Sequence, residues 1–123
     1  MQTLTHSNLT HMAGGFLLMG SWATFANWGH ALPAPLVAGL TQGILTACIT
    51  LGLKRLVEGL SARPPGHAGV VIPPLVACIT SVTLLYTVHR LAGTPKVWAT
   101  LAVPSTVASL YAALYTWRLR RTP

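Results

Sequence analysis

The chain has 123 residues, of which 52% are hydrophobic and 7% are charged, and its mean hydropathy is +0.58. A water-soluble domain carries about 25% charged residues, so this composition excludes an ordinary soluble domain and predicts an integral membrane protein. The net charge is +7, but the cations lie between apolar segments instead of along one face, which favours a role in membrane topology and argues against nucleic-acid binding.

The length allows a single integral membrane domain, residues 1–123, with about 20 residues for each of four spans. The first apolar segment covers residues 12–28. As a helix it rises about 26 Å, which is short of a hydrocarbon core about 30 Å thick, and a start near Leu9 would supply the difference. We therefore predict an all-α bundle of four transmembrane helices, with a re-entrant or interfacial first helix and three spans as the fallback.

The second predicted span covers residues 35–53, after the helix-breaking sequence GHALPAP. The helical pattern continues past it through KRLVEGL, which contains Glu58, the only acidic residue of the chain. Glu58 follows Lys54 by four residues and Arg55 by three, so one helix face carries all three charges beyond the apolar stretch. This position predicts a solvated charge at a helix end, because a carboxylate that couples protons to transport would lie within a span.

The third predicted span covers residues 72–91. It follows SARPPGHAG, the clearest loop sequence in the chain. We place Pro73 and Pro74 in the first turn of this helix, where their missing amide hydrogens cost little.

The fourth predicted span covers residues 96–117, with Thr94 as the N-cap and Pro95 as the first helical residue. Pro104 stands in the middle of this span. We expect it to kink the helix and to free the backbone carbonyl of Thr100, for which a hydroxyl or a neighbouring helix must provide the partner.

The cations are distributed unevenly between the two sides of the predicted bundle. Six lie after the second span or after the fourth, and two lie at the loop after the third: Lys54, Arg55, Arg63, Arg118, Arg120 and Arg121 against Arg90 and Lys96. Positive charge accumulates on the cytoplasmic side of membrane proteins. We therefore predict a multi-pass protein of the cell inner membrane, with a cytoplasmic C-terminus and, if there are four spans, a cytoplasmic N-terminus.

Each predicted span has a face of small and polar residues at helical spacing. Helices in lipid associate through such faces, because small residues let backbones approach closely and hydroxyls bond across the contact. The residues that we assign to helix packing are Gly39, Gly43, Ala47, Ser105 and Ser109. The other interpretation is a polar path along the bundle axis with an anion contact at its outer end, formed by Asn27, His30, Gln42, Thr46, Thr80, Thr83, Thr87, His89 and Arg90.

Side chains with catalytic or metal-binding chemistry are few and scattered. His30 and His89 lack a further ligand of the kind that a metal site needs, and Cys48 and Cys78 have no C-x-x-C or C-x-x-H neighbourhood. No pattern combines a nucleophile, a base and an orienting group. We therefore predict no catalytic residues, no metal and no cofactor, in a protein that is not an enzyme.

The function that these features predict is that of a small non-enzymatic membrane protein. It would serve as an accessory or assembly subunit of an envelope or transport system, with the lipid bilayer, other membrane protein subunits or further copies of itself as partners. One alternative is a self-standing oligomeric transporter or flippase of a small or lipid-linked anionic solute, which would use the axial hydroxyls and place Arg90 at the outer mouth. Another is a holin-like pore former, a class that shares the small size and a basic tail such as RLRRTP.

Overall fold

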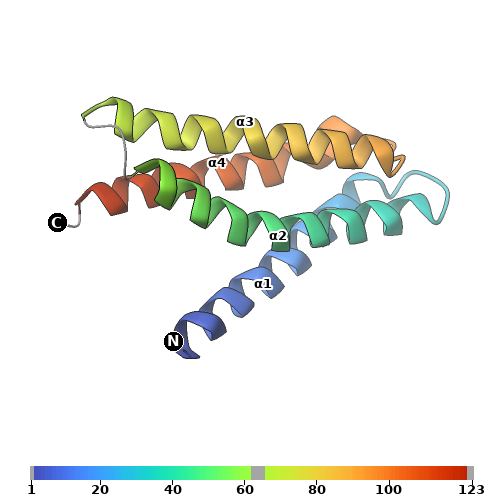
Figure 1. Ribbon diagram of the computed structural model, residues 1–123. Helices are drawn as coiled ribbons and strands as arrows, with labels where there is room; N and C mark the ends of the chain where they lie inside the picture. Colours follow the sequence, from blue (N-terminus) through green and yellow to red (C-terminus); the bar gives the residue numbers. More distant parts are fainter. Residues whose placement is uncertain (1, 62–65, 122–123) are drawn as a thin grey trace.

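The computed structural model describes residues 2–61 and 66–121, and all regular structure in these two ranges is helical. Four helices follow one another along the chain: α1 (Gln2–Ala26), α2 (Ala34–Ser61), α3 (Ala68–Leu91) and α4 (Val97–Arg121). Successive helices run in opposite directions (Figure 1). The prediction of an all-α protein built from four helices is confirmed.

Three of the helices, α2, α3 and α4, are long and apolar enough to cross a membrane. α1 is not among them although it has 25 residues. Polar side chains such as Thr10, His11, Ser21 and Thr24 are interspersed along it and lower its hydropathy. The chain is therefore compatible with a small membrane protein, and α1 is the helix for which the sequence allowed a re-entrant or interfacial position.

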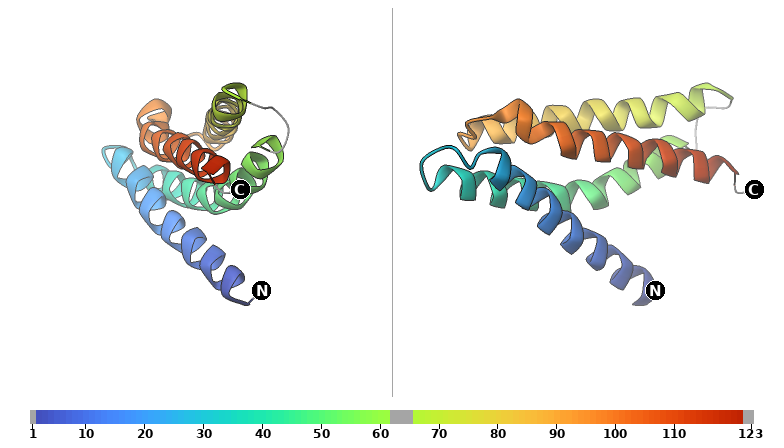
Figure 2. Two further views of the ribbon diagram at one scale, coloured as in Figure 1. Left: turned by 90° about the vertical axis from the view of Figure 1, so that its left-hand side faces the viewer. Right: turned by 180° about the vertical axis from the view of Figure 1, so that it is seen from behind.

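The two ends of the bundle differ in charge. At one end, here called the basic end, α2 and α4 terminate, α3 begins and the N-terminal part of α1 lies (Figures 1 and 2). The described cations toward this end are Lys54, Arg55, Arg118, Arg120 and Arg121. Arg63 lies outside the described residues. The opposite end carries the α1–α2 and α3–α4 connections, with Arg90 and Lys96, and the cytoplasmic position of the basic end stays a prediction.

α1 diverges from the other three helices toward the basic end. Figures 1 and 2 show its N-terminal half leaning away from the bundle, whereas its C-terminal half lies against α2. The closest approach joins glycines: a Cβ on Gly20 would lie 3.0 Å from the carbonyl oxygen of Gly39 and 3.6 Å from the Cα of Gly43. A Cβ on Gly39 would collide with the hydroxyl of Thr24. The two helices cross this closely because these residues have no side chain.

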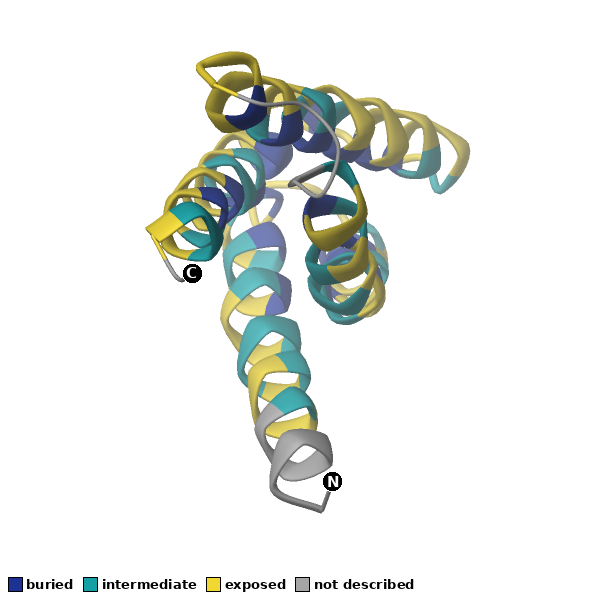
Figure 3. Cartoon of the chain, turned by 60° about the vertical axis from the view of Figure 1, so that its left-hand side comes forward, coloured by how far each residue is buried: buried dark blue, intermediate teal, exposed yellow. Residues whose placement is uncertain are grey.

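The apolar interior consists of two small clusters. The cluster toward the opposite end comprises Leu45, Leu85, Val97 and Leu101. The cluster toward the basic end comprises Leu53, Val57, Ala77 and Ala112. Figure 3 shows exposed residues along the outer faces of the helices, and many of them are large and apolar. Such a surface suits contact with lipid tails or with other membrane helices.

α1 begins at Gln2 instead of near residue 12, and the starts of α3 and α4 also differ from the predicted spans. α3 begins at Ala68, so the pair Pro73–Pro74 stands inside the helix instead of in its first turn. α4 begins at Val97, and the hydroxyl of Thr94, which was expected to cap it, lies 2.7 Å from Nδ1 of His89. Thr94 does not cap α4 because the turn after α3 directs its side chain back toward the end of α3.

Candidate functional site

Three large polar side chains are fully buried toward the opposite end of the bundle. Asn27, Gln42 and His89 are each 0% exposed and come from the end of α1, from α2 and from α3. Burying such groups costs free energy unless each one finds a hydrogen-bond partner. Their partners therefore decide whether they line an open path or hold the helices together.

Gln42 and His89 are bonded to each other across the contact between α2 and α3. Nε2 of His89 lies 2.8 Å from Oε1 of Gln42, and because an amide oxygen can only accept, the ring nitrogen donates. The amide nitrogen of Gln42 donates to the hydroxyl of Thr46 at 2.9 Å. Nδ1 of His89 lies 2.7 Å from the hydroxyl of Thr94. Both ring nitrogens and both ends of the amide are thus engaged within the protein.

The sequence HRLAGTP explains why Thr94 reaches His89. α3 ends in a Schellman motif, in which Gly93 has a φ of 74° and the amide of Thr94 donates to the carbonyl of His89 at 3.0 Å. Glycine takes this left-handed conformation without strain. An apolar contact commonly joins the two outer positions of such a motif. Here a hydrogen bond between the side chains of His89 and Thr94 takes its place.

Asn27 ties the end of α1 to the start of α4. Its Oδ1 accepts from the backbone amide of Lys96 at 2.9 Å, and its Nδ2 donates to the hydroxyl of Thr100 at 2.7 Å and to the carbonyl of Ala23 at 2.8 Å. The amide of Lys96 stands at the start of α4, where backbone amides lack partners within the helix. Asn27 therefore serves as a helix cap that is supplied by another helix.

We call this set of side chains the clasp: Asn27, Gln42, Thr46, His89, Thr94 and Thr100. It joins α1 to α4 and α2 to α3 at the opposite end of the bundle. The indole nitrogen of Trp22 adds a further bond from α1 to α4, because it donates to the carbonyl of Ala99 at 3.1 Å. The arrangement ties the four helices together at this end, and two of its members, Gln42 and Thr46, also line a cavity.

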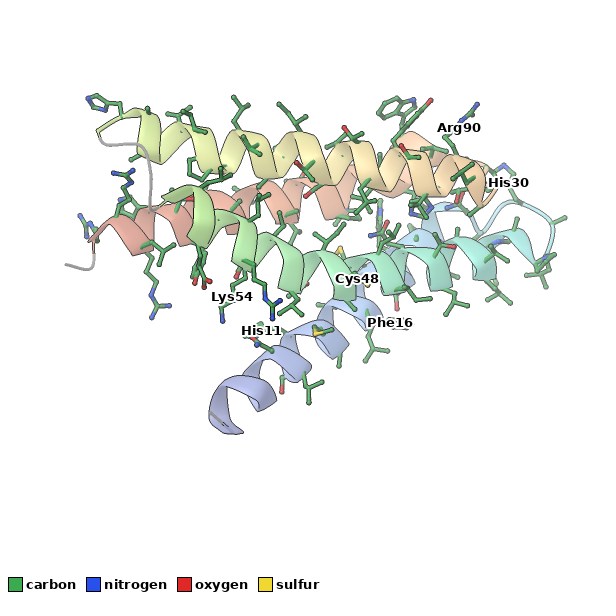
Figure 4. The ribbon with its side chains drawn as sticks, viewed as in Figure 1. His11, Phe16, His30, Cys48, Lys54 and Arg90 are labelled. Atoms are coloured by element: carbon green, nitrogen blue, oxygen red, sulfur yellow. The ribbon has the colours of Figure 1, made fainter. Side chains whose placement is uncertain are left out.

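The other residues of the predicted polar path lie outside the clasp. All of them are exposed: His30, Thr80, Thr83, Thr87 and Arg90. Figure 4 shows His30 and Arg90 at the opposite end. The buried face of α3 is instead the row that ends with Ser81, Leu85 and His89. A threonine tolerates an outward position because its hydroxyl can bond to its own helix, as Thr87 does by donating to the carbonyl of Thr83 at 2.8 Å.

The residues assigned to helix packing fall on different contacts. Gly39 and Gly43 lie on the face of α2 that meets α1. Ala47 is half-buried farther along α2. In α4 the hydroxyl of Ser109 donates to the carbonyl of Ser105 at 2.8 Å. The hydroxyl of Ser105 is buried and has no hydrogen-bond partner in the described part of the chain.

Two cavities adjoin in the gap between α1, α2 and α4. The first, here called the inner cavity, has a volume of about 200 Å³ and a mainly aliphatic lining. The second, here called the basic cavity, has a volume of about 500 Å³ and includes Lys54 and Arg118 in its lining. His11, Thr50 and Tyr111 line both cavities. A polar, cationic space therefore adjoins an apolar one.

Glu58 makes a contact that the sequence did not predict. Its Oε1 accepts a hydrogen bond of 2.6 Å from the hydroxyl of Tyr115, which joins α2 to α4 toward the basic end. The spacing of Glu58 from Lys54 and Arg55 indicates only a shared helix face. The tyrosine, 57 residues further along the chain, is brought to it by the packing of the helices.

Comparison with protein-family models, with curated proteins and with solved structures found no match for this chain. Among the described residues, no group of three or more His, Cys, Asp or Glu side chains is placed to hold a metal ion. The features on which a functional interpretation rests are therefore the clasp, the two cavities and the outer surface of the helices.

Proposed function

We propose that the chain is a non-enzymatic accessory or assembly subunit that binds a transmembrane helix of a partner protein. The observation that carries this proposal is a groove of about 720 Å³ between α1 and α2. Its lining comprises Phe16, Leu17, Gly20, Ser21, Thr24, Phe25, Trp28, Gly39 and Leu40.

The lining of the groove combines small residues with aromatic ones. Gly20, Ser21 and Gly39 allow another helix backbone to approach closely, and the aromatic side chains beside them supply contact area. The hydroxyl of Thr24 already donates to the carbonyl of Gly20 at 2.9 Å. The groove therefore offers a shape into which another helix can pack closely, and close van der Waals packing drives the association of helices in lipid.

The clasp favours a subunit role over transport by a single chain. A transporter needs polar groups that a solute can reach along the bundle. The side chains of the clasp are bonded to one another or to the backbone. The threonine row of α3, which transport along the axis would use, is exposed on the outside of the chain.

The test is site-specific photocrosslinking in native membranes, with a photoreactive amino acid at Leu17 in the groove or at Leu114 on α4. The two leucines are matched because they are 66% and 65% exposed. We expect a crosslinked partner protein from position 17 and none from position 114. Ser21→Phe, which fills the groove, should abolish the product, whereas Ala113→Phe on the exposed face of α4 should leave it unchanged.

Two results would contradict the proposal. A crosslinked product with twice the mass of the chain would identify a homo-oligomer as the occupant of the groove. Solute flux through vesicles that contain only the purified chain, unaffected by Ser21→Phe, would favour a self-standing transporter.

A further inference from the structure

We propose that the basic end of the bundle binds one anionic phospholipid, with its phosphate between Lys54 and Arg118 and the part of one acyl chain nearest the headgroup in the inner cavity. The site lies between α1, α2 and α4 and is distinct from the groove between α1 and α2. The proposal rests on the adjacency of a cationic cavity and an apolar cavity that share part of their lining.

The basic cavity collects positive charge from two helices. Lys54 belongs to α2 and Arg118 to α4. Polar side chains line the space with them: Asn8, His11, Thr50, Tyr111 and Tyr115. The hydroxyls of Thr50 and Tyr115 already donate, to the carbonyl of Thr46 and to Glu58. Ammonium and guanidinium groups are the side chains with which proteins bind phosphate.

The negative charge near this cavity is limited to one carboxylate. Glu58 is the only acidic residue of the chain, and it is not among the residues that line the cavity. Its carboxylate accepts the hydrogen bond of Tyr115 at 2.6 Å. Two cations against one carboxylate leave an excess of positive charge, which suits an anionic group.

The inner cavity supplies an apolar space directly beside these charges. Its aliphatic lining includes Leu18, Met19, Ile49, Leu53 and Val107. An inorganic anion would occupy the cationic part and leave the aliphatic part unfilled. A neutral lipid would fill the aliphatic part but bring no negative charge to the cationic part. A molecule with an anionic head and an apolar chain matches both linings.

The position of the site along the bundle fits a lipid headgroup. Lys54 directly follows the apolar stretch of α2, and Arg118 follows that of α4. If these helices span the membrane, both cations lie at the depth of the headgroups. The divergence of α1 opens the gap, and His11 and Lys54, labelled in Figure 4, both line the basic cavity there. Basic pockets between transmembrane helices on the cytoplasmic side are known to bind anionic headgroups, and the distribution of cations predicts that side for the basic end.

The experiment measures lipid binding to the purified, delipidated chain in mild detergent by native mass spectrometry. Phosphatidylglycerol is the probe, phosphatidylcholine with the same chains is the neutral control, and inorganic phosphate is the competitor without a chain. Lys54→Gln and Arg118→Gln test the headgroup contacts, and Arg90→Gln removes a matched exposed cation at the opposite end. A cation near the membrane surface contributes about fivefold in affinity. We expect one tightly bound phosphatidylglycerol. Its affinity should fall about fivefold in Lys54→Gln and in Arg118→Gln and should be unchanged in Arg90→Gln.

A second variant tests the chain-binding part. Val107→Phe fills the inner cavity and should weaken the binding of dipalmitoyl phosphatidylglycerol more than the binding of glycerophosphoglycerol, which has the same headgroup and no acyl chain. Equal affinity for phosphatidylglycerol and phosphatidylcholine would overturn the proposal. So would a loss of phosphatidylglycerol affinity in Arg90→Gln as large as the loss in Lys54→Gln and Arg118→Gln. Competition by inorganic phosphate at the concentration of the lipid would instead identify a site for free anions.

Discussion

Replacing Gln42 with leucine should destabilise the bundle, because it removes one partner of a buried pair and leaves the other in place. Nε2 of His89 would lose its acceptor at 2.8 Å in a position that is 0% exposed. An unsatisfied buried donor costs about 1–3 kcal/mol, and hydrogen bonds between membrane helices contribute about 0.6 kcal/mol on average and about 1.7 kcal/mol at most. We therefore expect the free energy of unfolding to fall by about 1–2 kcal/mol.

The decisive measurement is a double-mutant cycle with His89→Leu. When both partners become apolar, the buried donor is removed together with its acceptor, and the penalty is largely relieved. The double variant should therefore lose less stability than the sum of the single variants, with a coupling of about 1 kcal/mol. Unfolding is followed by circular dichroism in mixed micelles with increasing dodecyl sulfate. Thr87→Val on the exposed face of α3 is the control and should change the free energy by less than about 0.5 kcal/mol.

Strict additivity would refute this reasoning. If the two single losses sum to that of the double variant within about 0.3–0.5 kcal/mol, the side chains do not act as a pair. The same conclusion would follow if Gln42→Leu and Thr87→Val had equal effects. The clasp would then have no energetic role in holding α2 to α3.

Three further predictions concern packing and topology. Gly39→Ala should lower the free energy of unfolding by about 1–3 kcal/mol in the same dodecyl sulfate titration, because its Cβ would collide with α1. Gly52 has open space around it, so Gly52→Ala should raise the free energy of unfolding by up to about 1 kcal/mol. Ser81→Ala removes a buried hydroxyl that has no partner among the described residues, so its thermal midpoint should not fall. Reporter fusions should place Ala68 in the cytoplasm and Gly93 outside, and the reverse result would overturn the orientation.

The sequence predicted the helices well because their signals are local. Apolar runs, prolines and glycines near the ends mark each helix, and the all-α fold follows from them. The starts are less well predicted: α1 begins at Gln2 instead of residue 12, and α3 begins at Ala68 instead of residue 72. Prolines at 73 and 74 are accommodated inside α3, which the rule that places proline in the first turn does not anticipate.

The rotation of each helix about its axis was harder to predict. On α3, Thr80, Thr83 and Thr87 form a row at helical spacing, and the buried row through Ser81 and His89 has the same spacing. Spacing shows which residues share a face, but the neighbouring helices decide which face is buried. Side-chain size offers a better signal. Threonine can bond to its own helix, whereas the longer polar side chains of Gln42, Asn27 and His89 need partners elsewhere and therefore face inward.

α1 is the helix on which both proposals depend. Gly20 and Thr24 contribute to the groove, while Gly15 and Met19 contribute to the inner cavity, so each side of α1 borders one of the two proposed sites. The bonds of Asn27 and the glycine crossing fix the C-terminal half of the helix, whereas its N-terminal half leans away from the bundle. A helix that is fixed at one end and separated from its neighbours at the other leaves apolar surface on two sides, and in a bilayer that surface is covered by lipid or by another helix. The one described helix that lacks a stretch apolar enough to cross a membrane is therefore the one whose position depends most on what binds beside it.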